Sequence, residues 1–105
     1  MKITSPVKEF PGTIERPDSL TLPQVIAFEN GMKELKRDGT LAENDAEALG
    51  LILPYFTGWQ IEGQPKEPTV ETFVFTPRRA GAELVAWLWG EITRLYVGET
   101  EIPNA

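Results

Sequence analysis

The chain contains neither cysteine nor histidine. Without cysteine, disulfides, thiolate metal sites and cysteine nucleophiles are excluded. Without histidine, the commonest general base and nearly every zinc arrangement are excluded too, which leaves carboxylates, lysine and tyrosine for catalysis. No spacing brings two carboxylates to one apolar pocket, and the glycines form no phosphate-cradling loop. We therefore predict no catalytic, cofactor-binding or metal-binding residues.

Basic residues are also scarce, with 10 Lys and Arg against 16 Asp and Glu and a net charge of −6. Nucleic acids and anionic membranes bind proteins mainly through Lys and Arg, so neither is expected as a partner. The longest run without a charged or amide residue, Ala48 to Trp59, contains Pro54 and is too short for a membrane-spanning helix. Because Lys8 and Glu9 interrupt any signal-peptide core, we expect a cytoplasmic protein.

The densest apolar stretch is predicted to form a long helix from Thr76 to Gly98. Thr76 can cap it, Pro77 suits the first turn, and Gly98 can end it. At about 100° per residue, one continuous face should form the core side of the helix. That face holds Leu84, Val85, Leu88, Trp89, Ile92, Leu95 and Tyr96.

Trp87 lies outside this inward face, next to Leu84 and among charged residues. Because side chains two positions apart on a helix point in nearly opposite directions, one surface cannot bury both Trp87 and Trp89. We predict that Trp89 is a core residue and that Trp87, with Leu84 beside it, contacts a partner.

Arg78 and Arg79 occupy the first turn of this helix, where the helix dipole favours negative charge. Their position has two explanations: ion pairs with nearby acids, which we favour, or recognition of an acidic or phosphate-bearing partner. Both arginines are therefore candidate partner-binding residues.

Residues 1–20 contain three prolines and are predicted to form an extended arm. The arm could lie along its own domain, add a strand to a sheet, or embrace another copy of the chain. Residues 21–105 are predicted to form a single helical domain.

A first helix should start at Thr21, which has the capping-box spacing with Gln24, and end at Gly39. Ile26 lies off its apolar seam and is a further candidate partner contact. The seam consists of Val25, Phe28, Met32 and Leu35.

A second helix should begin near Asp45 and stop near Leu53, since Pro54 removes a backbone donor. Two β-prone pieces, Trp59–Glu62 and Val70–Phe75, could then pair as a small hairpin around a loop at 63–68. The predicted fold is mainly α, with about three helices, an extended N-terminal arm, and a small β-hairpin between helices two and three.

Three segments together resemble tail assembly chaperones of long-tailed, siphovirus-type bacteriophages. They are FPGTIERPDSLTLPQVIAF, ALGLILPYFTGWQIEG and TFVFTPRRAGAELVAWLWGEITRLY, and the resemblance spans Phe10 to Tyr96. It implies a non-enzymatic protein that binds the tape measure protein, keeps its long helices soluble, and helps recruit tail tube subunits. Such chaperones often exist in a short and a frameshifted longer form, and this chain would be the short one.

The resemblance thus implies two partners, the tape measure protein and the tail tube protein, in the host-cell cytoplasm. The apolar faces also lead us to expect a homo-oligomer. One alternative is a structural virion component, such as a head–tail connector or a tail-terminator subunit. Another is a small enzyme that uses carboxylates, which would need two acids with raised pKa in a deep pocket.

Overall fold

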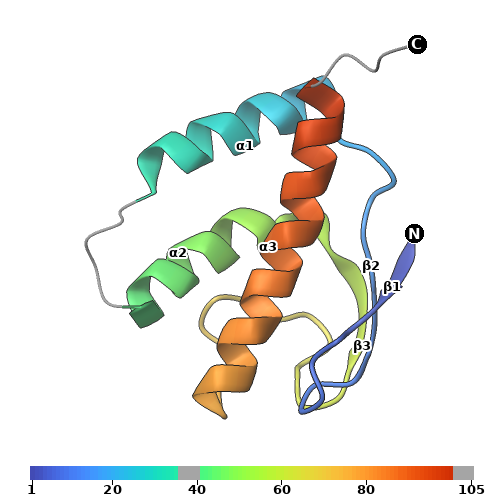
Figure 1. The fold of residues 1–105 in the computed structure, drawn as a ribbon, viewed down its shortest axis with the longest axis vertical. Coiled ribbons are helices and arrows are strands. Elements are labelled where there is room, and N and C mark those ends of the chain that lie inside the picture. Colours follow the sequence, from blue (N-terminus) through green and yellow to red (C-terminus); the bar gives the residue numbers. More distant parts are fainter. Residues whose placement is uncertain (36–40, 101–105) are drawn as a thin grey trace.

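Three antiparallel strands and three α-helices make up the computed structural model, which describes residues 1–35 and 41–100 (Figure 1). The elements are β1 (Lys2–Thr4), β2 (Gly12–Glu15), α1 (Leu22–Glu34), α2 (Leu41–Ile52), a 3₁₀ turn (Leu53–Tyr55), β3 (Thr57–Ile61) and α3 (Arg78–Thr100). The predicted mainly α fold is therefore wrong, because the chain is a small α+β protein. Its hairpin is β1–β2, which precedes the helices, and not a hairpin between helices two and three.

The predicted arm forms the first two strands of the sheet. Prolines keep this segment extended, and β1 pairs with β2 in antiparallel register, with Ile3 opposite Ile14. Val7, Phe10 and Ile14 are buried, at 4%, 3% and 0% exposure. The segment therefore packs on its own domain and supplies part of the core.

The third strand joins the sheet from a distant part of the sequence, giving the order β1-β2-β3. Gly12 allows this pairing, because its φ of 135° suits glycine and a Cβ there would lie 2.8 Å from the Cα of Ile61. The register is irregular between Thr13 and Glu15, where β3 carries an extra residue.

The second predicted strand, Val70–Phe75, is not a strand. The side chain of Gln64 occupies the position that a neighbouring strand would take. Its amide nitrogen donates to the Val74 carbonyl at 2.7 Å, and its oxygen accepts from the Val74 N–H at 2.9 Å. The hydroxyls of Thr69 and Thr72 stabilise a turn in the same segment, so β3 pairs with β2 instead.

The predicted start of the first helix is confirmed, since Thr21 and Gln24 form a complete capping box. α1 ends at Glu34, before the predicted end at Gly39, which lies outside the described residues. α2 begins at Leu41, earlier than predicted, and ends before Pro54, as predicted.

The third helix starts and ends later than predicted. Arg78 is its first residue, and the carbonyl of Pro77 accepts the N–H of Gly81 at 2.9 Å, so Thr76 lies outside the helix. Gly98 does not end α3, which continues to Thr100. The Thr76–Pro77 peptide bond is cis.

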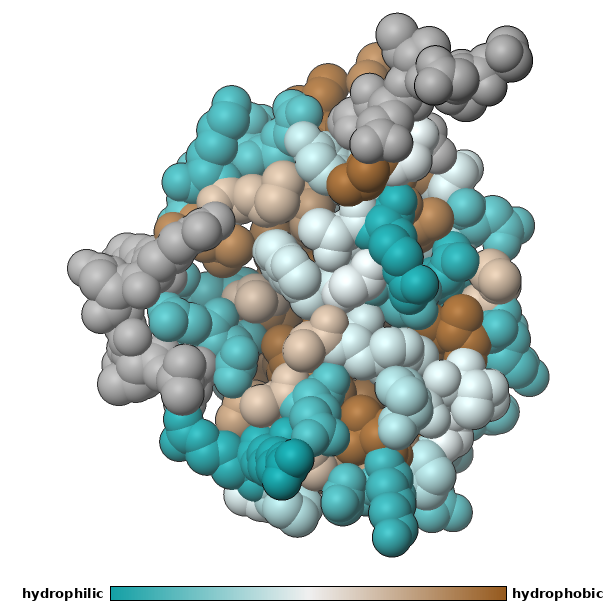
Figure 2. All heavy atoms as spheres, in the orientation of Figure 1, coloured by the Kyte–Doolittle hydropathy of each residue, from teal (hydrophilic) through white to brown (hydrophobic). Residues whose placement is uncertain are grey.

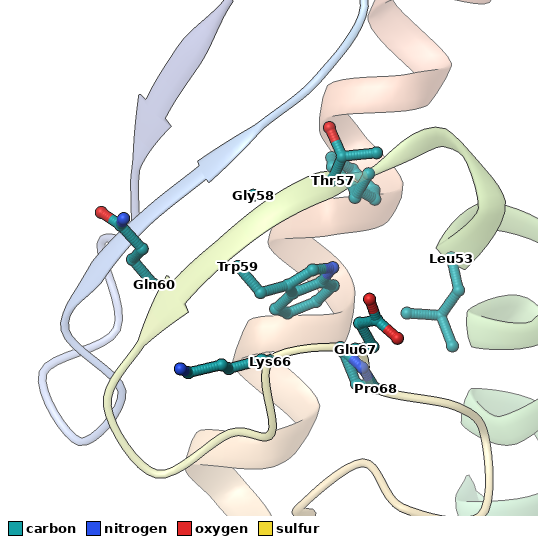
Figure 3. A pocket seen from close by; sticks show the side chains of 9 residues that line it. Leu53, Thr57, Gly58, Trp59, Gln60, Lys66, Glu67 and Pro68 are labelled. Carbon is teal, nitrogen blue, oxygen red and sulfur yellow. The ribbon is translucent and has the colours of Figure 1, made fainter.

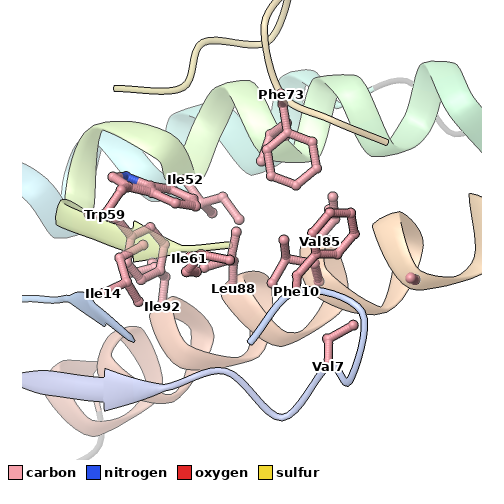
Figure 4. Close-up of a cluster of buried hydrophobic side chains, with 14 of the residues drawn as sticks. Val7, Phe10, Ile14, Ile52, Trp59, Ile61, Phe73, Val85, Leu88 and Ile92 are labelled. Atoms are coloured by element: carbon pink, nitrogen blue, oxygen red, sulfur yellow. The ribbon is translucent and has the colours of Figure 1, made fainter. Parts of the chain in front are cut away.

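The core lies where the sheet, α2 and α3 meet. Figure 4 shows Ile14 of β2 and Ile61 of β3 in one cluster with Ile52 of α2 and Leu88 and Ile92 of α3. α3 crosses the molecule between the sheet on one side and α1 and α2 on the other (Figure 1). Because α3 is covered from two sides, it supplies more fully buried side chains than any other element of the described structure.

A buried carboxylate connects the segment after β2 to α3. Glu91 Oε2 lies 3.1 Å from Arg16 Nε, and both side chains are largely buried, at 11% and 14% exposure. Arg94, which is 72% exposed, donates to the other oxygen, Glu91 Oε1. Arg16 also donates to the Pro17 carbonyl at 2.7 Å. The burial of one negative charge is thus offset by two guanidinium groups.

Candidate binding surfaces

The first half of α1 exposes apolar side chains on its outer side. Leu22 is 71% exposed and Ile26 is 49% exposed, and they lie one turn apart on the same face. Pro23 and Ala27 are also exposed. We call these four residues the outer face of α1. Val25 and Phe28 are the buried residues of α1 and pack on the core. The outer face of α1 therefore lies on another side of the helix and stays exposed.

Figure 2 places apolar atoms at the upper end of the molecule, where α1 begins and α3 ends in Figure 1. Elsewhere on this face, apolar atoms occur as small separate patches among polar ones. Val97, near the end of α3, is 43% exposed and lines a shallow hollow of about 410 Å³ with Gly90, Thr93 and Arg94.

Trp87 and Leu84 have little surface to offer a partner. Leu84 is fully buried, at 0% exposure, and Trp87 is half-buried and packs against the core. Trp89 is half-buried as well, with its ring 5.5 Å from that of Phe28. Both tryptophans are covered in part because α3 is packed from two sides, which the sequence pattern of one helix does not reveal.

Arg78 and Arg79 are exposed at the beginning of α3. Arg79 Nε lies 3.2 Å from Glu83 Oε1, one turn along the helix, so the ion pair that we favoured is present for Arg79. Its side chain remains 93% exposed, and such a pair contributes little stability. A hollow of about 460 Å³ beside Arg79 is lined by side chains of both charges, among them Lys8 and Glu9.

The five predicted partner-binding residues do not form one surface. Arg78 and Arg79 begin α3, whereas Ile26 lies on α1, which contacts the other end of α3 through Phe28 and Tyr96 (Figure 1). Of the five, Ile26 is the exposed apolar residue, and its neighbour on the same face is Leu22. The sequence analysis did not identify Leu22, although its spacing of four residues from Ile26 places the two on one face of a helix.

A second site, which the sequence analysis did not identify, is a pocket of about 600 Å³ beside β3 (Figure 3). Its wall is formed by the strand, the preceding 3₁₀ turn and the proline-rich loop. The lining residues are Leu53, Phe56, Thr57, Gly58, Trp59, Gln60, Lys66, Glu67 and Pro68. The available signal was an aromatic residue, Trp59, in a β-prone piece that is followed by a long, proline-rich loop.

Two tyrosines of the described residues have pKa values above the ordinary value of this side chain. The Tyr96 hydroxyl donates to Glu29 at 2.8 Å, and this hydrogen bond, burial and the negative charge of Glu29 raise the pKa of Tyr96. Burial also raises the pKa of Tyr55, which donates to the Gln24 carbonyl at 3.3 Å. A raised pKa makes the nucleophilic phenolate rarer at neutral pH.

Nowhere in residues 1–35 and 41–100 do three or more acidic side chains gather in a way that could hold a metal ion. None of the helices in the same ranges combines the length and the apolar character needed to cross a bilayer. The chain matches no protein-family model, and neither a curated protein nor a solved structure shows significant similarity to it.

Proposed function

We propose that this protein acts by binding other proteins and not by catalysis, as a tail assembly chaperone of a long-tailed bacteriophage. In this role it binds helices of the tape measure protein and helps recruit tail tube subunits in the host cytoplasm. The observation that carries the proposal is the exposure of Leu22 and Ile26, at 71% and 49%, one turn apart on α1. Apolar side chains at this spacing are suited to packing against another helix.

The outer face of α1 is the better candidate for the contact than Trp87. A binding residue must bury surface that is exposed in the free protein, and Trp87 is already half-buried in its own core. Leu22 and Ile26 are held on a helix whose start is stabilised by the Thr21 capping box, so they are presented with little loss of conformational entropy on binding. The net charge of −6 favours solubility of a complex with an apolar client.

The test is co-expression with the tape measure and tail tube proteins encoded beside this gene, followed by capture through a tag on this chain. The double variant Leu22→Ser and Ile26→Ser should retain less than about a tenth of the captured tape measure protein, a loss typical of interface anchors. Val70→Ser is the matched control, because Val70 is an exposed apolar residue, at 38%, in the loop before α3. It should leave capture unchanged.

Capture of the tape measure protein by the double variant at the wild-type level would contradict the proposal. Purified mature virions provide a second check, because a chaperone leaves the tail after assembly. Finding this protein in them at a fixed number of copies would instead favour a structural component, such as a head–tail connector or a tail-terminator subunit. Sedimentation of the free protein would test the expected self-association.

A further inference from the structure

The pocket beside β3 contains a hydrogen-bond donor without a partner. Trp59 is 8% exposed as a whole residue, and its indole N–H makes no hydrogen bond to any described residue. The nitrogen itself is not fully buried, so water can reach it from the pocket. Figure 3 shows the nitrogen at the edge of the ring that faces Leu53, Thr57 and Glu67 across the pocket. A ligand that accepts from this donor replaces a hydrogen bond to water with one inside the pocket, which gives a modest net gain.

The fold holds this donor in a constant position. The Trp59 ring packs edge-on against Phe56, with centroids 6.3 Å apart, and belongs to the buried core. Trp59 lies in the irregular part of β3, between Thr57 and Gln60, both of which pair with β2. β3 is the last strand of the sheet, so the pocket adjoins its free edge.

The neighbouring segment leaves that edge open. It contains Pro65 and Pro68, and proline has no N–H to donate, so the segment cannot extend the sheet. Gln64 makes a single backbone bond to the Ile61 carbonyl at 3.2 Å, after which the chain turns away from β3. The space between the strand and this segment is the pocket of about 600 Å³.

The chemistry of the lining selects a neutral acceptor. Lys66 and Glu67 carry opposite charges at the rim, so the pocket has no net positive charge to bind an anion. One carboxylate cannot hold a metal ion alone. Leu53, Phe56 and Pro68 supply apolar walls beside the indole donor.

An amide carbonyl next to an apolar side chain meets all these conditions, and it is the repeating unit of a polypeptide. We propose that this pocket binds a short extended segment of a partner protein, with a backbone carbonyl accepting the Trp59 indole N–H. Its volume falls in the usual range for ligand pockets, roughly 300–1,000 Å³. The inference goes beyond the proposed function, because the pocket and the outer face of α1 share no residue.

The probe is the capped tripeptide acetyl-Ala-Leu-Ala-methylamide, titrated into the ¹⁵N-labelled full chain while NMR follows the three tryptophan indole N–H signals. The Trp59 signal, assigned through Trp59→Phe, should move downfield and saturate at millimolar peptide. The signals of Trp87 and Trp89 should not move. Trp59→Phe keeps an aromatic ring but removes the donor, and it should weaken binding roughly fivefold, followed through backbone amides of β3.

Trp89→Phe is the matched control, since it makes the same change outside the pocket, and it should bind the peptide as the wild type does. If the Trp59 signal stays still at saturating peptide, or if sodium acetate moves it and the peptide does not, the proposal is wrong. Should Trp59→Phe fail to fold, Trp87→Phe and Trp89→Phe assign the other two indole signals, and the remaining signal of the wild type, that of Trp59, decides alone. This experiment does not involve the tape measure protein, so a negative result would contradict the peptide-binding proposal without bearing on the proposed function.

Discussion

The helices α1 and α3 carry similar apolar side chains but use them differently. On α3, Leu84, Leu88 and Ile92 are all at 0% exposure, because the sheet covers one side of this helix and α1 and α2 cover the other. On α1, Leu22 and Ile26 remain at 71% and 49% exposure, because this helix packs through one side only. The contrast shows that burial depends on how many neighbours an element has, and not on its apolar content alone.

Substitutions in the two helices should therefore affect different properties of the protein. Substitutions on the inward faces of α3 remove packing and should reduce the free energy of unfolding. Substitutions on the outer face of α1 should leave that free energy nearly constant and reduce partner binding. The following predictions test this division, from the largest expected effect to the smallest.

The strongest test compares the same substitution on the two helices. Leu88→Ala should reduce the free energy of unfolding by about 3 kcal/mol, because it leaves a cavity at a site with 0% exposure. Leu22→Ala should change it by less than about 0.5 kcal/mol. Urea unfolding followed by tryptophan fluorescence measures both, and similar losses from the two variants would remove the distinction between the helices.

The second test concerns the charges along α3. Glu91→Gln should cost about 2 kcal/mol, because it leaves the Arg16 guanidinium, with its side chain 14% exposed, without a counter-charge. Arg94→Ala should cost less than about 1 kcal/mol, since Arg94 is 72% exposed. Urea unfolding measures the effect of both substitutions. A larger loss of stability from Arg94→Ala than from Glu91→Gln would show that the buried pair of Glu91 with Arg16 does not contribute most of the stabilisation.

The third test uses two glycines of α3 and predicts effects of opposite sign. At Gly81 an alanine Cβ would lie 2.8 Å from the Cα of Phe75, so Gly81→Ala should cost about 1–2 kcal/mol through a backbone clash. At Gly90 a Cβ would meet nothing within 4 Å, so Gly90→Ala should stabilise the helix by about 0.5–1 kcal/mol. Thermal unfolding should show Tm moving down for the first variant and up for the second.

Much of the helical structure could be predicted from local signals. The Thr21 capping box, the stop before Pro54 and the inward face of α3 all depend on residues within a few turns of one another. The sheet could not be predicted in this way. Whether Trp59–Glu62 pairs with the following segment or with residues near the start of the chain depends on contacts far apart in sequence, and both options have β-prone residues.

The candidate sites were predictable only in part. Ile26 was found because it lies off the apolar seam of its own helix, a property of the sequence alone. Trp87 was placed outside the inward face of α3 by the same reasoning, but the pattern of one helix does not show that a second layer covers it. The unpartnered indole of Trp59 depends on where the loop at 63–68 runs, which local patterns do not determine.

The sequence by itself therefore determined the approximate positions of the helices and the most buried part of the α3 core face, together with the extended character of residues 1–20 and the absence of cysteine and histidine chemistry. Only the tertiary structure decided that this extended segment becomes two strands, that Gln64 replaces the expected hairpin partner, and that Leu22 and Ile26 stay exposed. The physical reason is the distance along the sequence over which each interaction acts. Helix capping and periodicity act over a few residues, whereas strand pairing and burial depend on which distant segments meet.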